Sequence, residues 1–335
     1  MNKTLALGFA FACIALPASA QVTLKLADSF PTSHYISVHA ARKFMDEATR
    51  NANGALKFEY YPTEQLGKAK DFLQLTTAGV MDIAYIVPSY VSEKMPLSAV
   101  GELPGMFATA CQGSAAYWAL SRDGILYDRE FKPNGVKPLM AFAISPYQVS
   151  TRGAPLAKFD DLKGLKIRAA GGAFDLTLRT LGAVPIRLAA PDVRESLLRG
   201  TIDGTVGPAG SMKPYDLLTV VKNTTVGASF GGLVATYSIS LKKWQGLSPE
   251  IQKALADAGE ATIKSFCKVS DDQEEEAVKE FEAAGGKAWR LNDGERADLA
   301  RRLEPVTGDW AKRLDDRKLP GTDVLKAFQA AAKQG

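Results

Sequence analysis

The order of apolar and polar side chains predicts alternating strands and helices in the first part of the chain. Apolar residues alternate with polar ones or run together over 22–27, 56–61 and 81–87, and each run has the length of a strand. An apolar stripe at helical spacing occupies 38–48, and a second helix is predicted over about 68–77. This β-α-β-α-β order is typical of a mostly parallel sheet covered by helices.

The rest of the chain continues this pattern up to one unusually long helical stretch. Strands are predicted near 136–144, 165–168, 184–186, 201–206, 223–226 and 233–241, helices near 113–121, 191–199 and 212–218, and a helical tail interrupted near Pro305 and Pro320. Nothing breaks the helix between Pro249 and Ala284; Ser248 can cap its start, and Gly285-Gly286 stops it. Such a helix would be about 54 Å long, so we expect it to lie along two domains.

The first 20 residues have the pattern of a secretory signal peptide. Lys3 is followed by an apolar run over 5–16, and the Ala-Ser-Ala segment 18–20 offers a cleavage site before Gln21. The apolar run is too short to span a membrane. We therefore expect an exported protein, most simply one located in a bacterial periplasm.

Charge and cysteine content narrow the classes of function. The 335 residues carry a formal net charge of only +4, and the basic side chains are dispersed, which does not indicate a nucleic-acid-binding protein. Cys13 would leave with the signal peptide, and Cys111 and Cys267 remain. In an oxidising compartment these two could form a disulfide or stay separate thiols, and the sequence leaves both possibilities open.

The sequence contains no recognisable catalytic or metal-binding set. Its two histidines, His34 and His39, are not accompanied by an H-E-x-x-H or C-x-x-C pattern, so a zinc site is not expected. A G-x-S-x-G elbow, a P-loop and a G-x-G-x-x-G fingerprint are also missing from the sequence. We therefore predict that the protein is not an enzyme and uses no metal or cofactor. His34 is interpreted as a polar residue at a helix start, with a ligand contact as the alternative.

Arg168 is the most informative single residue. Apolar and polar residues alternate over 165–168, Gly171-Gly172 ends the strand, and a helix over about 174–181 follows. The arginine thus lies where a strand hands over to a helix, the edge at which open α/β sheets bind ligands. Its guanidinium offers a planar fork of donors that matches a carboxylate. An ordinary surface ion pair is the alternative, and spacing alone does not exclude it.

Short segments in a characteristic order carry a family resemblance. They are LKLA at 24–27, YPTEQLG at 61–67, GVMDI at 79–83, LPGMF at 103–107, LKGLKIR at 162–168, GAVP at 182–185, RGTIDG at 199–204 and PYDL at 214–217. In their order and spacing they resemble the DctP-type solute-binding proteins of TRAP transporters. The resemblance covers essentially the whole chain after the signal peptide.

The resemblance implies a two-lobed periplasmic-binding-protein-like α/β fold, with hinge strands and a long helix along both lobes. The expected limits are 21–144 plus 233–270 for lobe I and 145–232 plus 271–335 for lobe II. A ligand would be held in the cleft between the lobes, with Arg168 clamping its carboxylate. The expected partners are a small organic carboxylate and the membrane permease subunits, and the expected oligomeric state is a monomer.

The chain departs from sugar-acid-binding relatives at the position of a second arginine, where Pro146 stands. The remaining candidate ligand-binding residues are Ser29, Tyr85, Val87, Tyr90, Tyr147, Phe174, Gly207 and Phe230. We expect this pocket to have one cation, several aromatic groups and few partners for ligand hydroxyls. Because an unpaired buried polar group costs about 1–3 kcal/mol, a polyhydroxylated ligand would fit poorly.

A monocarboxylate with an apolar or aromatic body is therefore the predicted ligand. That prediction depends on Arg152 and Arg187, because either side chain, if turned into the cleft, would supply the missing second cation. Two other functions remain as alternatives: a ligand sensor of the same fold, and a Rossmann-like oxidoreductase. The missing dinucleotide fingerprint argues against the oxidoreductase.

Overall fold

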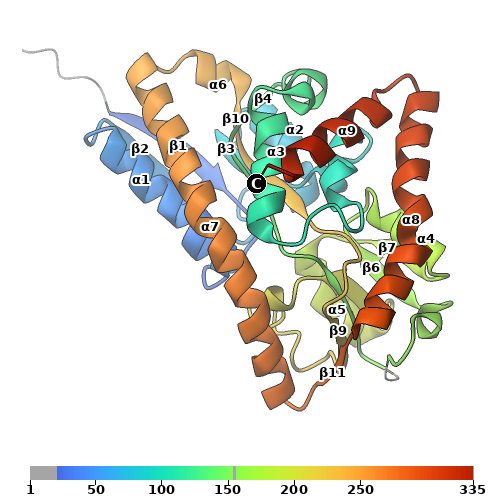
Figure 1. The fold of residues 1–335 in the computed structure, drawn as a ribbon. Helices are drawn as coiled ribbons and strands as arrows, with labels where there is room; N and C mark the ends of the chain where they lie inside the picture. Colours follow the sequence, from blue (N-terminus) through green and yellow to red (C-terminus); the bar gives the residue numbers. More distant parts are fainter. Residues whose placement is uncertain (1–20, 154–155, 335) are drawn as a thin grey trace, which may run out of the picture.

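The computed structural model describes residues 21–153 and 156–334, so the predicted signal peptide lies outside the described part of the chain. In this part the chain forms two β-sheets that lie one below the other in Figure 1, with helices around both and the helix α7 along one side. The predicted two-lobed α/β fold is confirmed.

The first sheet has five strands, in the order β2-β1-β3-β10-β4. They are β1 (Val22–Ala27), β2 (Leu56–Tyr61), β3 (Ile83–Ile86), β4 (Val136–Ala143) and β10 (Val234–Ser240). The first three are parallel to one another, whereas β10 runs antiparallel to both β3 and β4. All four residues of β3 are buried, because the strand lies in the middle of the sheet.

The second sheet has six strands, in the order β11-β9-β5-β8-β6-β7. They are β5 (Gln148–Thr151), β6 (Lys166–Ala169), β7 (Val184–Arg187), β8 (Gly204–Gly207), β9 (Asn223–Val226) and β11 (Lys287–Arg290). Here β5 is the antiparallel strand, because it pairs with β8 and β9 in the opposite direction. Both sheets are therefore mixed, and the antiparallel pairings all involve β5 or β10.

These two antiparallel strands follow the segments that cross between the sheets. One crossing runs from β4 through Ile144 to β5, and the other from β9 through Leu233 to β10. The two crossings lie side by side: the Ile144 N–H donates to the Leu233 carbonyl (2.8 Å), and the Tyr147 N–H donates to the Gly231 carbonyl (2.7 Å). A crossing strand enters its sheet against the direction of the local β-α-β strands, which explains the mixed pairing.

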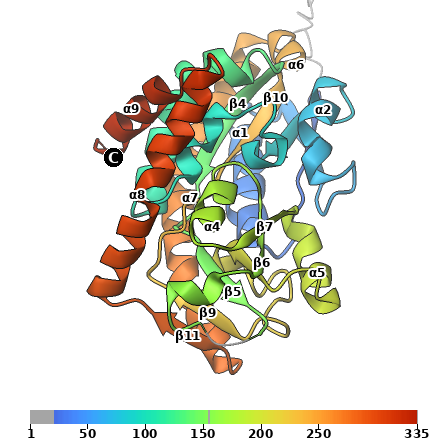
Figure 2. The same cartoon turned by 90° about the vertical axis from the view of Figure 1, so that its right-hand side faces the viewer.

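Helices surround both sheets (Figures 1 and 2). They are α1 (Lys43–Asn51), α2 (Phe72–Thr77), α3 (Ala110–Arg122), α4 (Phe174–Thr180), α5 (Val193–Arg199), α6 (Leu241–Gln245), α7 (Pro249–Ala283), α8 (Asp293–Asp316) and α9 (Gly321–Ala332). A wider helical turn over Ser37–Arg42 leads directly into α1. The expected N-cap of α7 is present, since the Ser248 hydroxyl accepts the Ile251 N–H.

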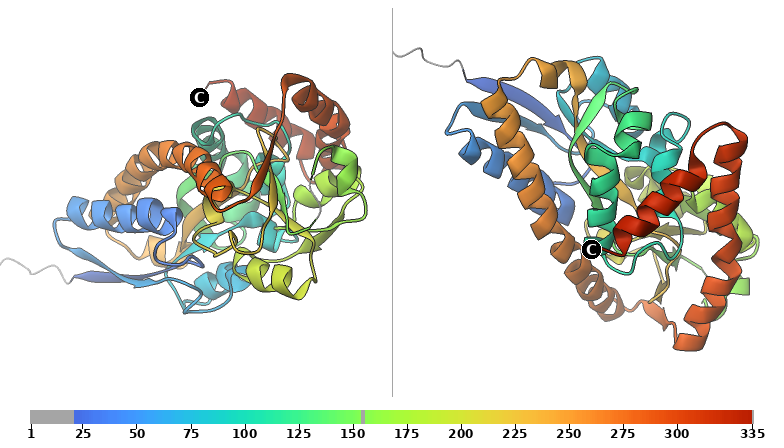
Figure 3. Two further views of the ribbon diagram at one scale, coloured as in Figure 1. Left: turned by 90° about the horizontal axis from the view of Figure 1, so that it is seen from below. Right: turned by 45° about the horizontal axis from the view of Figure 1, so that its top comes forward.

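Helix α7 reaches both sheets, as expected from its length. It packs against α1, α3 and β4 on one side, and against β11 and the short 3₁₀ turn Ala209–Ser211 on the other (Figure 3). A Cβ on Gly259 would lie 1.9 Å from the Leu139 carbonyl oxygen, so only glycine lets the helix approach β4 this closely. Cys267 of α7 forms a disulfide with Cys111 of α3, which decides the alternative that the sequence left open.

Two local predictions were wrong, and two strands were missed. The segment 212–218 forms turns rather than a helix, because Pro214 lies within it and Asp216 has a left-handed backbone (φ 53°). Helix α8 continues through Pro305; its buried apolar face, with Leu303 and Val306, outweighs the lost hydrogen bond. The strands β5 and β11 were not predicted.

The residue limits of the lobes stay a prediction. The two C-terminal helices, both expected in lobe II, pack against different sheets. Helix α8 packs beside α4, next to the second sheet, but α9 returns to the first and packs on α3 (Figure 2). The Gln112 side-chain amide of α3 donates to the Ala332 carbonyl at the end of α9 (2.9 Å).

Candidate functional site

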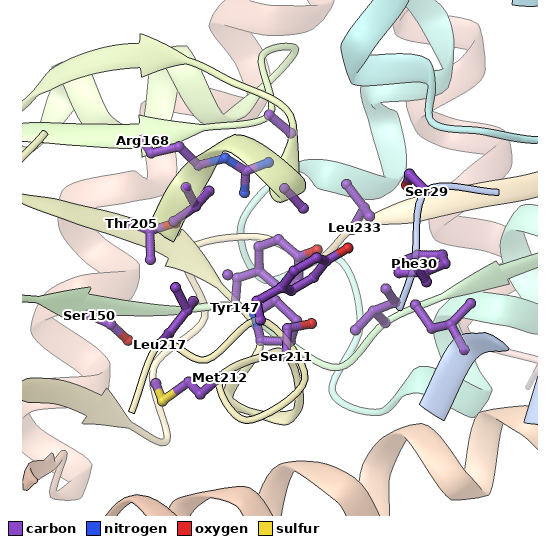
Figure 4. Close-up of a pocket in the computed structure, with 18 of the residues that line it drawn as sticks. Ser29, Phe30, Tyr147, Ser150, Arg168, Thr205, Ser211, Met212, Leu217 and Leu233 are labelled. Atoms are coloured by element: carbon purple, nitrogen blue, oxygen red, sulfur yellow. The ribbon is translucent and has the colours of Figure 1, made fainter. Parts of the chain in front are cut away.

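A cavity lies between the two sheets, next to the crossing segments, and we call it the interlobe cavity (Figure 4). Residues from both sides line it: Ser29, Phe30, Ile36, Tyr85, Tyr90, Ile144, Tyr147, Ser150, Arg168, Ala170, Ala190, Val193, Thr205, Gly207, Pro208, Ser211, Met212, Tyr215, Leu217, Val221 and Leu233. Most of these side chains are apolar or aromatic, and Arg168 is the one cation among them.

Arg168 enters this cavity from β6, where its neighbours across the sheet are Thr205 and Ile186. The side chain is only 5 % exposed. Its Nε donates to the Leu188 carbonyl (2.8 Å), and its two terminal nitrogens lie 3.5 Å from the Val206 carbonyl and 3.4 Å from the Tyr90 hydroxyl. The guanidinium is thus held in one orientation by neutral oxygen atoms.

No protein anion neutralises this guanidinium: none of the ion pairs formed within residues 21–153 and 156–334 includes Arg168. The alternative of an ordinary surface ion pair is therefore wrong. A buried charge without a partner is strongly unfavourable. The arrangement can bind an anion that enters the cavity, and a carboxylate matches the fork of donors.

The backbone after Arg168 turns sharply at Gly171, with a φ of 112°. A Cβ at this position would lie 2.7 Å from the Ser89 carbonyl oxygen. Next to it, Gly172 contacts the buried Glu102 carboxyl, which also accepts the Ala173 N–H that begins α4 (3.4 Å). Because Ser89 and Glu102 belong to the first lobe, glycines allow the two lobes to approach closely beside the cavity.

The structure brings six of the predicted ligand-binding residues to the interlobe cavity. They are Ser29, Tyr85, Tyr90, Tyr147, Arg168 and Gly207. Their contact with a ligand stays a prediction, but their positions around Arg168 support it.

The other four predicted residues do not line this cavity. Phe174 lies behind it and stacks on Tyr147, with 5.3 Å between the ring centroids. Phe230 is buried against Phe159, with 6.4 Å between centroids. Val87 is buried in the core. Pro146 lines a separate groove beside α7.

Neither of the two arginines that could have changed the prediction reaches the interlobe cavity. Arg152 donates to the Leu197 carbonyl near the end of α5 (2.8 Å). Arg187 is half exposed and forms ion pairs with Asp175 (2.6 Å) and Glu93 (3.6 Å). The lining therefore keeps the single cation that the sequence predicted.

The expectation of few hydroxyl groups was wrong. Four residues with hydroxyl groups that sequence reasoning did not select also line the cavity: Ser150, Thr205, Ser211 and Tyr215. Tyr215 lies in the PYDL segment, but it was not selected because a helix was wrongly predicted for 212–218. The hydroxyls of Tyr85 and Tyr215 are buried and have no hydrogen-bond partner in the described part of the protein.

His34 lies directly behind the cavity wall and is fully buried. Burial lowers its pKa to about 3, so the ring is neutral at physiological pH. Its Nδ1 accepts the Ile36 N–H (3.2 Å), and its Nε2 lies 3.1 Å from the Ser211 hydroxyl oxygen. The ring packs between those of Phe30 and Tyr35, at centroid distances of 4.4 and 4.7 Å. It is therefore a supporting residue of the site.

Two features are absent from residues 21–153 and 156–334. No group of three or more His, Cys, Asp or Glu side chains is placed to hold a metal ion there. No helix there is long and apolar enough to cross a membrane.

Comparison with known proteins agrees with this geometry. The family model described as bacterial extracellular solute-binding protein, family 7 (DctP), matches residues 28–313. The C4-dicarboxylate-binding periplasmic protein DctP of Rhodobacter capsulatus is 27% identical over 306 residues, which cover 88% of this chain and 86% of the relative.

Two solved structures show the same fold. A TRAP solute-binding protein from Rhodoferax ferrireducens, in complex with copurified benzoate, has a TM-score of 0.88 at 22% identity and covers 94% of this chain and 98% of its own. A marine metagenome TRAP solute-binding protein specific for aromatic acid ligands, in complex with metahydroxyphenylacetate, has a TM-score of 0.87 at 27% identity and covers 94% and 99%. The chain belongs to the DctP family of bacterial extracellular solute-binding proteins, the substrate-binding components of TRAP transporters.

Proposed function

We propose that this protein captures a small monocarboxylate with an apolar or aromatic body in the interlobe cavity and delivers it to membrane permease subunits. The observation that carries the proposal is the buried guanidinium of Arg168, which faces an apolar cavity without a protein anion. A carboxylate would form two charge-assisted hydrogen bonds with it, each contributing about 1.5–3 kcal/mol.

The lining favours one carboxylate over two. A dicarboxylate would place its second charge among tyrosine, leucine and valine side chains, where no lysine or arginine reaches it. Burying that charge without a partner is heavily disfavoured. An apolar body instead gains about 25 cal/mol for each Å² that it buries. The relative from Rhodobacter capsulatus, named for C4-dicarboxylates, would then differ from this chain in its ligand.

The size of the cavity supports a compact ligand. Water centres can occupy about 60 Å³ of it. A space of this size holds a few water molecules, which suits a compact ligand. The two structural neighbours bind benzoate and metahydroxyphenylacetate, which belong to this size class.

The function proposed here is transport rather than catalysis. The family consists of substrate-binding proteins, and the predicted signal peptide would bring the chain to the periplasm. There the liganded, closed protein would dock on the permease subunits as a monomer.

Isothermal titration calorimetry of the mature protein tests the proposal. We expect aromatic, 2-oxo or 2-hydroxy monocarboxylates to bind at least about tenfold more tightly than succinate, malate or sialate. Tighter binding of a dicarboxylate or a sugar acid would contradict it.

A further inference from the structure

Three hydroxyl groups on the wall of the interlobe cavity can each bind a polar atom of a ligand. They belong to Tyr85 of β3, to Ser211 and to Tyr215. Tyr85 is only 2 % exposed, and its ring packs against Phe30 with 4.7 Å between centroids. The hydroxyls of Tyr85 and Tyr215 have no partner in the described part of the chain. Leaving a buried hydroxyl without a partner is costly, so these groups are suited to bind a polar atom of a ligand.

The hydrogen bond between His34 and Ile36 determines whether the Ser211 hydroxyl can donate its proton to a ligand. Because Nδ1 of His34 accepts the Ile36 N–H (3.2 Å), the ring proton is on Nε2. Nε2–H therefore donates to the Ser211 oxygen, 3.1 Å away. The serine oxygen acts as acceptor in this contact, so its own proton is free to be donated, and Ser211 lines the cavity.

Tyr85 enters the cavity from a different sheet than Arg168 does. Its strand β3 and its ring partner Phe30 belong to the first lobe, whereas Arg168 enters from the second. Figure 4 shows Arg168 on one side and Phe30 on the other, with Tyr147 and Ser211 between them. Burial raises the pKa of Tyr85, and the neighbouring tyrosines Tyr147, Tyr90, Tyr35 and Tyr215 raise it further. Three of these four neighbours, Tyr147, Tyr90 and Tyr215, also line the cavity.

We propose that Tyr85, Ser211 and Tyr215 form a hydroxyl subsite that selects ligands with an oxygen atom on the body in addition to the carboxylate. This inference rests on the proposed function, because Arg168 must hold the carboxylate to place that oxygen. The preferred class is then a monocarboxylate with a hydroxyl or carbonyl group on its ring or chain. A plain aromatic acid leaves the three hydroxyls without a ligand partner and binds more weakly.

The test compares ligands that differ by one hydroxyl group. Calorimetry of the mature protein would measure benzoate, 3-hydroxybenzoate and 4-hydroxybenzoate. We expect one of the hydroxylated acids to bind at least about tenfold more tightly than benzoate. In Tyr85→Phe and in Ser211→Ala, the ratio of the affinity for that hydroxylated acid to the affinity for benzoate should fall toward one.

Tyr117→Phe is the matched control. It removes the hydroxyl of another buried tyrosine, one of α3, which is not among the residues that line the cavity. The ratio should keep its wild-type value in this variant. A thermal melt of each variant establishes that it folds.

The outcomes separate this subsite from the proposed function. Benzoate binding as tightly as both hydroxylated acids, or an unchanged ratio in both Tyr85→Phe and Ser211→Ala, overturns the subsite and leaves the proposed function in place. If none of these acids and no other monocarboxylate binds, the proposed function is wrong and the subsite is wrong with it.

Discussion

Replacing Arg168 by methionine removes the one cation of the interlobe cavity while keeping most of the volume of its side chain. The loss of two charge-assisted hydrogen bonds should cost about 3–6 kcal/mol of binding free energy. This corresponds to a fall in affinity of roughly 10²- to 10⁴-fold. Arg168→Lys keeps a charge but not the planar fork, so its affinity should lie between those of the wild type and Arg168→Met.

The stability of the unliganded protein provides a second, independent readout. The substitution leaves the Leu188 carbonyl without the donor that Nε supplies at 2.8 Å, which is destabilising. It also removes a buried charge that has no protein anion, which is stabilising. Because the two effects oppose each other, the midpoint of thermal unfolding should change little, whereas the increase caused by ligand should disappear.

Calorimetry and thermal melts with benzoate measure both quantities. Arg152→Met is the matched control, because the same change is made in the second lobe at a side chain that donates to Leu197 outside the cavity. An affinity for benzoate within about threefold of wild type in Arg168→Met would refute the assignment. An equal loss in Arg152→Met would show that the effect is not specific to the cavity.

Three further predictions concern motion, covalent structure and pH. Small-angle scattering should give a smaller radius of gyration with saturating ligand, because the crossings at Ile144 and Leu233 act as a hinge; identical profiles would indicate a rigid cleft. Loss of the Cys111–Cys267 disulfide, which spans 156 residues, should lower the free energy of unfolding by about 2–5 kcal/mol in urea titrations of a double serine variant; an unchanged midpoint would contradict this. Burial raises the pKa of Glu102 from 4.5 to about 8, so the folded protein holds this proton where the unfolded chain has lost it. That stabilisation is complete below pH 4.5 and is lost as the pH rises through about 8. The unfolding temperature should therefore fall between pH 6 and 8 less in Glu102→Gln than in wild type, and an equal fall in both would contradict the assignment.

The sequence predicted the parts of the fold that depend on local pattern. The strands over 22–27, 56–61 and 223–226 and the long helix α7 agree with the structure because their apolar spacing and stop signals are strong. Strand β5 was missed because three of its four residues, Gln148, Ser150 and Thr151, are polar yet buried in the sheet. Their burial depends on neighbours that are distant in sequence, such as Thr224, whose hydroxyl lies 2.8 Å from that of Ser150.

The candidate site was predictable where one residue had a distinctive chemistry and position. Arg168 follows from a strand end and a glycine turn, and its place in the cavity agrees with that reasoning. Phe174 and Phe230 were predicted to line the cavity but are buried in the core, because an aromatic residue near a strand end can face either the cavity or the core. The direction of Pro146 and the partner of His34 depend on the crossing segments and on Ser211, which lies 177 residues further along the chain.

The attachment of α7 to both lobes limits how far the cleft can widen. The helix is fixed against β4 at Gly259, and further along Glu274 accepts the N–H groups of Ala209 and Gly210 (2.7 and 3.2 Å) in the second lobe. A rotation of the lobes must therefore bend α7 between these two points or break the hydrogen bonds of Glu274. Gentle curvature is tolerated by a long helix, whereas a sharp kink is not. We therefore expect α7 to resist wide opening of the cleft, and replacing two exposed residues between Gly259 and Glu274 by glycine should make the helix easier to bend and broaden the range of interlobe angles.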